Sequence, residues 1–180
     1  MIVVPTFAGK TVAVLGLGKS GLSAALALKS GGAVAYAWDD NDAARKAAEE
    51  NGIAVADWMT INWADCSALI LSPGIPLNFP TPHPVIELAR ANDCQIIGDI
   101  ELLCQAQRDA RFIGITGTNG KSTTTTLLGH ILSECGELAE IGGNLGTPAL
   151  DLAPLTGNDA YVLELSSYQL DLCPTAIMDY

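Results

Sequence analysis

The segment from Arg111 to Thr123, RFIGITGTNGKST, constrains this chain more than any other. The short apolar run Phe112–Ile115 predicts a buried strand, and the small residues Thr116–Gly120 predict a turn. From Lys121 onward, leucine and isoleucine recur at helical spacing, which predicts a helix. A strand, a glycine-rich turn and a helix in this order form a phosphate-binding site, because the backbone N–H groups and the dipole at the helix start favour an anion.

Within this segment, a lysine and a serine hydroxyl are the side chains suited to bind a nucleoside triphosphate. Lys121 would supply a mobile positive charge for the terminal phosphates, and Ser122 would be a first ligand of Mg²⁺. The spacing departs from the general P-loop pattern, which asks for glycine where Ile115 stands. The alternative is a glycine-rich loop with an unrelated lysine. The residues expected to bind the nucleotide are Gly117, Thr118, Asn119, Gly120, Lys121, Ser122 and Thr123.

A second glycine-rich turn lies near the N-terminus. A predicted buried strand, Thr11–Leu15, runs into GLGKSG at residues 16–21, followed by a predicted helix at Leu22–Ser30. A further predicted strand, Ala33–Trp38, ends at Asp39, about twenty residues after the glycines, as the dinucleotide-binding fingerprint requires. The pattern predicts a Rossmann-like unit and leaves its ligand open.

Other polar loops follow predicted strands. Ser72-Pro73-Gly74 comes directly after the predicted strand Ala68–Leu71, at the sheet edge where α/β folds bind ligands. An ordinary strand-ending turn is the equal alternative. Asn144 lies in a third glycine-rich loop, after a strand expected at Leu138–Ile141. A last strand is expected to start at Ala176.

One acid stands inside an apolar predicted strand, Tyr161–Leu165. Burying a carboxylate is costly unless it meets a cation or hydrogen-bond donors. Glu164 is therefore expected to bind Mg²⁺, directly or through water. The alternative is a glutamate facing solvent from an edge strand.

Composition narrows the function classes. The formal net charge of -11 argues against a nucleic-acid groove, which needs basic patches. The five cysteines include no Cys-x-x-Cys pair and are expected to be buried free thiols in a reducing compartment. The sequence does not begin with the basic segment and long apolar run of a signal peptide, and no apolar stretch is long enough to span a membrane. We expect a cytoplasmic protein that binds neither nucleic acid nor membrane.

Six motifs in this order resemble the Mur ligases, above all the members that add D-glutamate. They are GLGKSG (16–21), SPGI (72–75), GDIEL (98–102), TGTNGKST (116–123), GNLG (143–146) and ELSSYQL (164–170). The resemblance covers essentially the whole chain. It implies an α/β fold, with a Rossmann-like UDP-binding domain at residues 1–108 and the first part of a P-loop ATPase domain at residues 109–180. It also implies further sequence that this chain lacks, including a third domain that binds D-glutamate.

The resemblance further implies an ATP-dependent ligase that is monomeric. The carboxylate of UDP-N-acetylmuramoyl-L-alanine would become an acyl phosphate, which D-glutamate attacks. Lys121 and Glu164 would be catalytic, and ATP and Mg²⁺ would be the cofactors. Ser122 would be a ligand of one Mg²⁺ and Glu164 a ligand of a second. The residues implied in substrate binding are Leu17, Gly18, Asp39, Ser72, Pro73, Gly74, Asn144, Ser166 and Gln169. Asp40-Asn41 replaces the Thr-Arg pair common in the family, which leaves the uracil contacts open.

Three alternatives remain. The first glycine fingerprint alone would suit an NAD-dependent oxidoreductase, which leaves the second glycine loop and Glu164 unexplained. Another P-loop enzyme, such as a folylpolyglutamate synthase-like ligase, does not account for the preceding Rossmann-like unit. A nucleotide-sugar-binding fragment without activity is compatible with the ligase interpretation.

Overall fold

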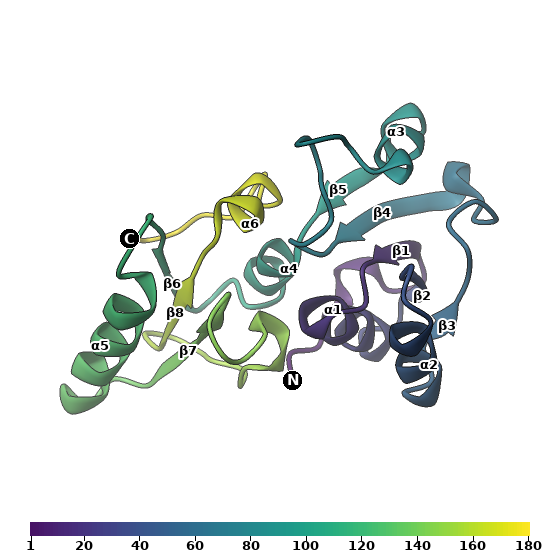
Figure 1. Cartoon of the computed structure of the whole chain (residues 1–180). Helices are drawn as coiled ribbons and strands as arrows, with labels where there is room; N and C mark the ends of the chain where they lie inside the picture. The colour runs from purple at the N-terminus through teal and green to yellow at the C-terminus, as the bar shows by residue number, and fades with distance from the viewer.

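A computed structural model describes residues 1–180 and confirms the predicted α/β class, with two parallel sheets (Figure 1). The strands are β1 (Thr11–Leu15), β2 (Val34–Trp38), β3 (Ala54–Val55), β4 (Cys66–Leu71), β5 (Gln95–Ile97), β6 (Arg111–Ile115), β7 (Ala139–Gly143) and β8 (Ala160–Glu164). The α-helices are α1 (Lys19–Ser30), α2 (Asp42–Glu50), α3 (Pro84–Ala91), α4 (Asp99–Ala106), α5 (Lys121–Glu134) and α6 (Ser167–Asp171).

The first sheet has the order β3-β2-β1-β4-β5. Its central strand β1 pairs in parallel with β2 and β4, with Leu15 opposite Trp38 and Leu71. The strand ends are therefore aligned, and the loops after β1, β2 and β4 leave the same edge. Buried apolar residues dominate β1 and β4 because helices cover both faces of a parallel sheet.

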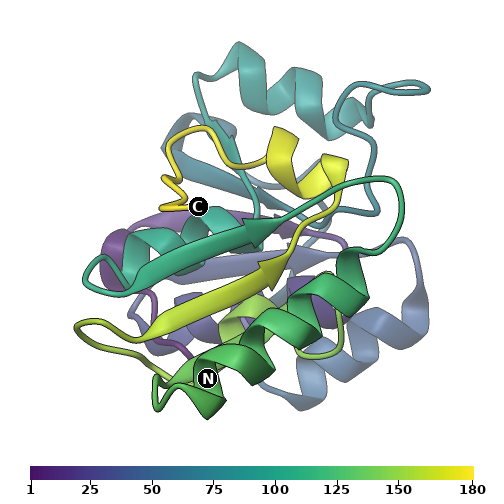
Figure 2. The same ribbon diagram turned by 90° about the vertical axis from the view of Figure 1, so that its left-hand side faces the viewer.

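The second sheet has the order β6-β8-β7, so β8 is its central strand. Figure 2 looks onto this sheet, with β6 and β8 in front and α5 running along them. Helix α5 approaches β7 closely at Gly129, where an added Cβ would lie 2.2 Å from Cδ1 of Ile141. The glycine inside this helix is thus required by packing rather than by backbone conformation.

The larger of two hydrophobic core clusters runs through both sheets. Val14 of β1 and Leu163 of β8 belong to the same buried cluster. Helix α4, which lies between the sheets in Figure 1, packs against α1 and against the short turn Ala149–Asp151. The N-terminal segment joins the same region, since Ile2 N–H donates to the Leu150 carbonyl at 2.6 Å. The division at residue 108 falls between the sheets and stays a prediction.

Some local predictions were wrong. Helix α1 begins at Lys19 rather than Leu22, and therefore includes Gly21. Residues from Ala176 to Met178 form no strand; instead Asp179 N–H donates to the Phe112 carbonyl at 2.8 Å along the edge of β6. The chain therefore meets the edge of β6 at Asp179, three residues after the predicted strand start at Ala176.

The cysteines are all free, as predicted, but they are not all buried. Cys66 and Cys94 are buried, whereas Cys104 and Cys173 are half-buried and Cys135 is exposed at the end of α5. Burial raises the pKa of the Cys104 and Cys173 thiols to about 12. None of the helices combines the length and apolar character needed to cross a lipid bilayer.

Candidate active site

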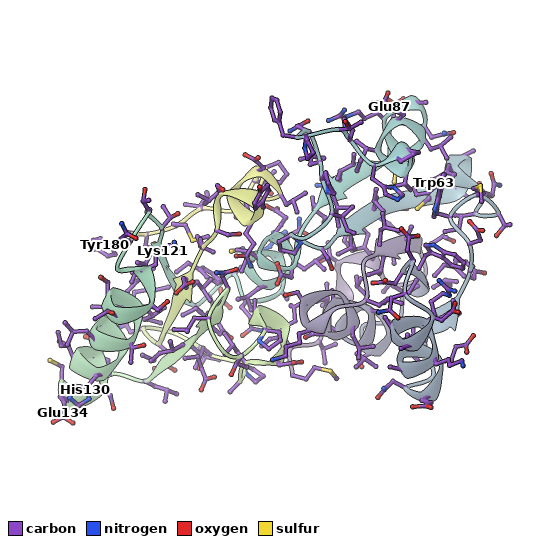
Figure 3. The ribbon with its side chains drawn as sticks, viewed as in Figure 1. Trp63, Glu87, Lys121, His130, Glu134 and Tyr180 are labelled. Atoms are coloured by element: carbon purple, nitrogen blue, oxygen red, sulfur yellow. The ribbon has the colours of Figure 1, made fainter.

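The predicted phosphate loop, residues 116–120, joins β6 to α5. Gly117 has φ 143° and Gly120, the N-cap of α5, has φ 80°, backbone conformations that favour glycine. The first N–H groups of α5 have no partner within the helix and so face the loop. Lys121 stands at this helix start (Figure 3), and its Nζ donates to the Gly117 carbonyl at 2.7 Å. The ammonium group is therefore held at the loop, where a phosphate would replace the carbonyl as its partner.

Glu164 lies at the end of β8, beside this loop. Its side chain is only 3% exposed, and Ser122 Oγ donates to its Oε2 at 2.6 Å. Asn144 Nδ2 donates to Oε1 at 2.8 Å. The hydrogen bond from Ser122, that from Asn144 and the charge of Lys121 hold the pKa of Glu164 below its usual value despite burial. The alternative of a solvent-facing glutamate on an edge strand is wrong, because β8 is central.

The pair Ser122 and Glu164 fits a hard divalent cation. Both offer oxygen atoms, and Mg²⁺ in nucleotide sites uses one or two protein ligands, completed by phosphates and water. No group of three or more His, Cys, Asp or Glu side chains is placed so that it could hold a metal ion. The chain therefore offers no all-protein metal cage, and a cation held by Ser122 and Glu164 would need further ligands from outside the protein.

Most predicted substrate residues line one cavity of about 520 Å³ between the two sheets, called here the inter-sheet cavity. The first-sheet side supplies Gly18, Asp39, Ser72, Pro73 and Gly74, and the second-sheet side supplies Asn144 and Gln169. The structure does not bring Leu17 or Ser166 to its lining. The volume is typical of small-molecule sites. Residues 117–123 lie outside the cavity and are linked to it through Glu164 and Asn144.

Tight packing fixes the first-sheet wall. An added Cβ at Gly21 would lie 1.7 Å from the Gly16 carbonyl oxygen, so α1 can begin this close to β1 only with glycine there. Ser72 Oγ donates to the same carbonyl at 2.8 Å, which joins the loop after β4 to the loop after β1. Gly18 differs, because an added Cβ there would meet nothing within 4 Å. Its open side faces the cavity.

Asp39 is occupied by backbone groups. Leu17 N–H donates to its Oδ2 at 2.6 Å, and Asn41 N–H donates to its Oδ1 at 2.8 Å. The Leu17 N–H is thus turned toward Asp39 in this structure. Asp39 orders the turn after β1 and still presents an edge to the cavity.

On the opposite wall, Gln169 belongs to a capping box at the start of α6. Its Oε1 accepts from Ser166 N–H at 3.1 Å, and its own N–H donates to Ser166 Oγ at 3.2 Å. Gln169 is 2% exposed, so its amide is held in one place. Ser166 therefore orients Gln169 instead of lining the cavity itself.

Sequence analysis missed part of the lining. Lys19 and Ser20 lie inside the GLGKSG fingerprint, yet only Leu17 and Gly18 of that motif were predicted to bind the substrate. Lys19 is the one Lys or Arg of the lining, and it has no acidic partner. The other missed residues are Gly16, Ile75, Gly143, Gly146 and Pro148. The GNLG motif gave a usable signal for two of these glycines.

Comparisons with known proteins agree with this geometry. Residues 115–177 match a family model described as the Mur ligase middle domain, and residues 6–74 match one described as the NADPH-binding domain of acetohydroxy acid isomeroreductase. The UDP-N-acetylmuramoylalanine--D-glutamate ligase of Paramagnetospirillum magneticum is 55% identical over 96% of this chain, and that of Agrobacterium fabrum is 50% identical over 97%.

The chain spans 38% of the length of each of these two ligases. Among solved structures, a murein peptide ligase from Psychrobacter arcticus aligns with 89% of this chain and 38% of its own, with a TM-score of 0.53 and 21% identity, which supports the fold. The middle-domain match falls on the phosphate loop and Glu164, and the identity to the ligases extends over both sheets. The chain therefore belongs to the Mur ligase family.

Proposed function

We propose that this chain is the part of a D-glutamate-adding Mur ligase that holds UDP-N-acetylmuramoyl-L-alanine in the inter-sheet cavity and ATP at residues 117–123. The observation that carries the proposal is the chain of contacts from the cavity to the phosphate loop: Asn144 to Glu164 to Ser122. It supports an arrangement in which an acceptor substrate and a triphosphate would lie on two sides of one carboxylate. The two bacterial relatives named above bear the name of this ligase, and the activity proposed is that of a protein of their length.

The UDP end would occupy the first-sheet wall. Gly18 leaves room for a diphosphate to approach the backbone, and Lys19 and the start of α1 offer positive potential there. Ser72 and Gly74 would border the nucleoside. The sugar and its peptide would extend across the cavity to Asn144 and Gln169, which bring its carboxylate toward the phosphate loop.

The reaction proceeds in two displacements. A carboxylate oxygen attacks the γ-phosphorus of ATP and ADP leaves; the amine of D-glutamate then attacks the acyl carbon, loses a proton, and inorganic phosphate leaves. Lys121 would move from the Gly117 carbonyl to the transferring phosphate and neutralise its charge. Ser122 and Glu164 would hold Mg²⁺, which supplies further neutralisation when bound. The cavity walls contribute by positioning the two reactants.

The match to an NADPH-binding domain makes a dinucleotide the second candidate ligand for the first sheet. The charges near the end of β2 disfavour it. Asp39 and Asp40 stand where the 2′-phosphate of NADPH would need a cation, and Asp39 already accepts two backbone N–H groups. A diphosphate-linked sugar that reaches Gln169 makes use of both walls.

Calorimetric titration of this chain tests the proposal. UDP-N-acetylmuramoyl-L-alanine should bind and NADPH should not. The Lys121→Ala variant should lose ATP binding by about tenfold or more, the effect of removing a charged hydrogen-bond donor, while it retains the UDP-sugar. Binding of NADPH alone would reject the proposal, and so would equal ATP affinity of the variant and the wild type.

A further inference from the structure

The GDIEL motif at residues 98–102 has no part in the sites described above, although it begins α4 between the two sheets. Its first residue touches the segment that follows β8. Gly98 N–H donates to the Leu172 carbonyl at 2.9 Å, and an added Cβ at Gly98 would lie 2.9 Å from the Leu172 Cβ. The stretch from Ser166 to Ala176, called here the α6 segment, therefore packs directly on the start of α4.

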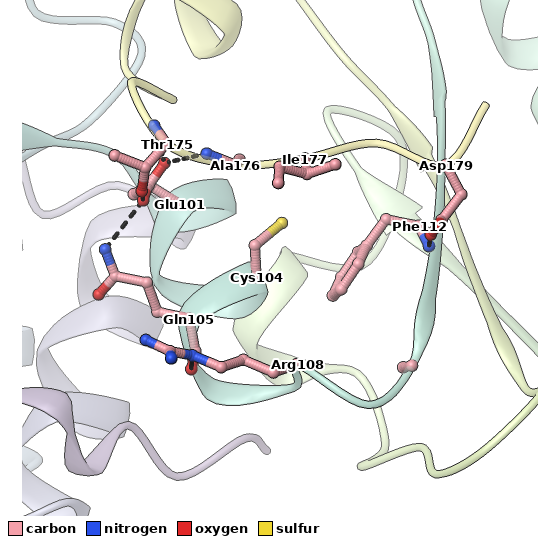
Figure 4. Close-up of a pocket in the computed structure, with 10 residues that line it drawn as sticks. Glu101, Cys104, Gln105, Arg108, Phe112, Thr175, Ala176, Ile177 and Asp179 are labelled. Carbon is pink, nitrogen blue, oxygen red and sulfur yellow. Dashed lines mark hydrogen bonds between the residues drawn. The ribbon is translucent and has the colours of Figure 1, made fainter.

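Glu101 binds the far end of the same segment. It is fully buried, and its Oε2 accepts from Thr175 N–H at 3.1 Å and from Ala176 N–H at 2.8 Å. Its Oε1 accepts from Gln105 Nε2 at 2.9 Å and from the Thr175 hydroxyl (Figure 4). No salt bridge of the chain involves Glu101. A buried carboxylate satisfied by backbone and hydroxyl donors, without a cation, holds a chain segment rather than a charge partner.

Asp99 lies at the near end, behind the cavity wall. Its side chain is 3% exposed; Oδ1 accepts from Ile100 N–H at 3.0 Å, and Oδ2 has no hydrogen-bond partner. Burial raises the pKa of Asp99, and the neighbouring Gln169 amide and Ser20 hydroxyl oppose that rise. These two neighbours line the inter-sheet cavity from opposite sheets, whereas Asp99 does not line it. Asp99 thus leaves one buried carboxylate oxygen without a hydrogen-bond donor at the start of α4.

We propose that Gly98 and Glu101 are positioning residues that dock the α6 segment on α4 and thereby set where Gln169 stands in the inter-sheet cavity. Glu101 fixes the segment after α6, and Gly98 allows the close approach of Leu172. The motif acts through Gln169 and touches no ligand. The part of this inference that concerns a ligand rests on the proposed function.

The docking itself is tested without ligand, by hydrogen–deuterium exchange of the chain. Glu101→Met removes both acceptor oxygens at similar length, and the amides of Thr175 and Ala176 should exchange about tenfold faster or more, as for a locally released segment. Amides of β1 and β4 should keep their protection. Glu101→Gln can retain one acceptor oxygen and should restore most of the protection. Glu87→Met, on exposed α3, is the matched control.

Unchanged exchange at residues 175 and 176 in Glu101→Met would overturn the docking. Should that variant fail to fold, Gly98→Ala provides a second test, because its new Cβ would push Leu172 away; protection of the α6 segment equal to the wild type would again overturn the proposal. These outcomes do not depend on which ligand the cavity takes.

The effect on the cavity is measured by comparing the affinities for two ligands. UDP reaches the first-sheet wall only, whereas UDP-N-acetylmuramoyl-L-alanine would extend to Gln169. In Glu101→Met the affinity for UDP should stay unchanged. The ratio of the affinity for UDP-N-acetylmuramoyl-L-alanine to the affinity for UDP should fall about tenfold, as for a lost positioned hydrogen bond. A wild type that binds the longer ligand no better than UDP would reject the proposed function and leave the exchange result standing. A variant that keeps the full gain would reject the positioning role.

Discussion

Asn144 donates two hydrogen bonds to Glu164. Its Nδ2 donates to the Glu164 carboxylate at 2.8 Å, and its backbone N–H donates to the Glu164 carbonyl at 2.8 Å. A residue that lines the inter-sheet cavity is thereby fixed to the acid that also holds Ser122 of the phosphate-loop helix. The loop after β7 and the end of β8 form one unit around this acid.

Glu164→Gln tests that unit. The new side-chain NH₂ group would face one of two groups that now donate to Glu164, the Asn144 amide or the Ser122 hydroxyl. The substitution also removes the negative charge that suits Mg²⁺. We expect Mg²⁺-dependent ATP binding to fall by about tenfold or more. Titration of ATP at several Mg²⁺ concentrations measures it, with Glu134→Gln at the exposed far end of α5 as control (Figure 3). Identical Mg²⁺ dependence in both variants would remove Glu164 from the site.

The lowered pKa of Glu164 predicts a direction for acid stability. The usual pKa of this carboxyl group is 4.5, and in the folded protein the pKa is lower, so that the group stays charged to lower pH. The unfolded chain therefore binds more protons near and below this pH, so the stability that Glu164 contributes is present above about pH 4.5 and is lost as pH falls through the folded pKa. Denaturant midpoints measured from pH 7 downward should fall less steeply for Glu164→Gln than for the wild type. Parallel curves would contradict this.

Two glycines of one fingerprint should respond in opposite ways to alanine. At Gly21 a Cβ would collide with the Gly16 carbonyl, so Gly21→Ala should lower the thermal midpoint strongly or prevent folding. At Gly18 a Cβ meets no protein atom and φ is -63°, so Gly18→Ala should fold with a nearly unchanged midpoint. Because that Cβ would enter the cavity, UDP affinity should nevertheless fall. A Gly18→Ala protein that binds UDP normally would place the diphosphate elsewhere.

Lys19 should attract the diphosphate. The chain carries a net charge of -11, so a cation in the cavity lining offsets general repulsion of an anionic ligand. Lys19→Ala should weaken UDP binding by about threefold to fivefold at low salt, the range of an exposed ion pair, and the difference should shrink as salt rises. Lys46→Ala, exposed on α2, is the matched control. A salt-independent loss would indicate a packing effect instead.

The Tyr161 hydroxyl contacts two backbone groups and one side chain. Its hydroxyl donates to the Ala153 carbonyl at 2.8 Å and lies 3.1 Å from Leu155 N and 3.0 Å from Gln107 Oε1. Tyr161→Phe leaves the Ala153 carbonyl without this partner and should lower the free energy of unfolding by about 1–3 kcal/mol. Urea denaturation measures it. An unchanged midpoint would mean that water replaces the hydroxyl.

Tyr161 also predicts behaviour at high pH. Burial raises its pKa from 10.0 to about 12, so the neutral phenol is favoured in the folded state. Its contribution to stability is complete below pH 10 and is lost as pH rises toward 12. The difference in stability between the wild type and Tyr161→Phe should therefore narrow over that range. A constant difference would argue against the raised pKa.

The sequence predicted the elements that depend on local pattern. The strand, glycine turn and helix at Phe112–Lys121 are where the spacing put them, because glycine conformation and apolar periodicity are properties of adjacent residues. The joining of Ser122 to Glu164 across 42 positions is a tertiary contact, which no local pattern contains. The central place of β8 was equally invisible, since strand order follows from packing. The position of Lys19 depends on α1 starting three residues earlier than its apolar pattern indicates.

The capping box at Ser166 and Gln169 begins two residues after Glu164, so one short, rigid stretch of chain carries both the metal-binding candidate and a wall of the cavity. The two sites cannot move independently. Ligand-induced displacement of Gln169 would be transmitted along this stretch to Glu164, and the reverse holds for nucleotide binding. Thermodynamic linkage then requires that the two ligands change each other's affinity by the same factor, so that measuring either effect fixes the other.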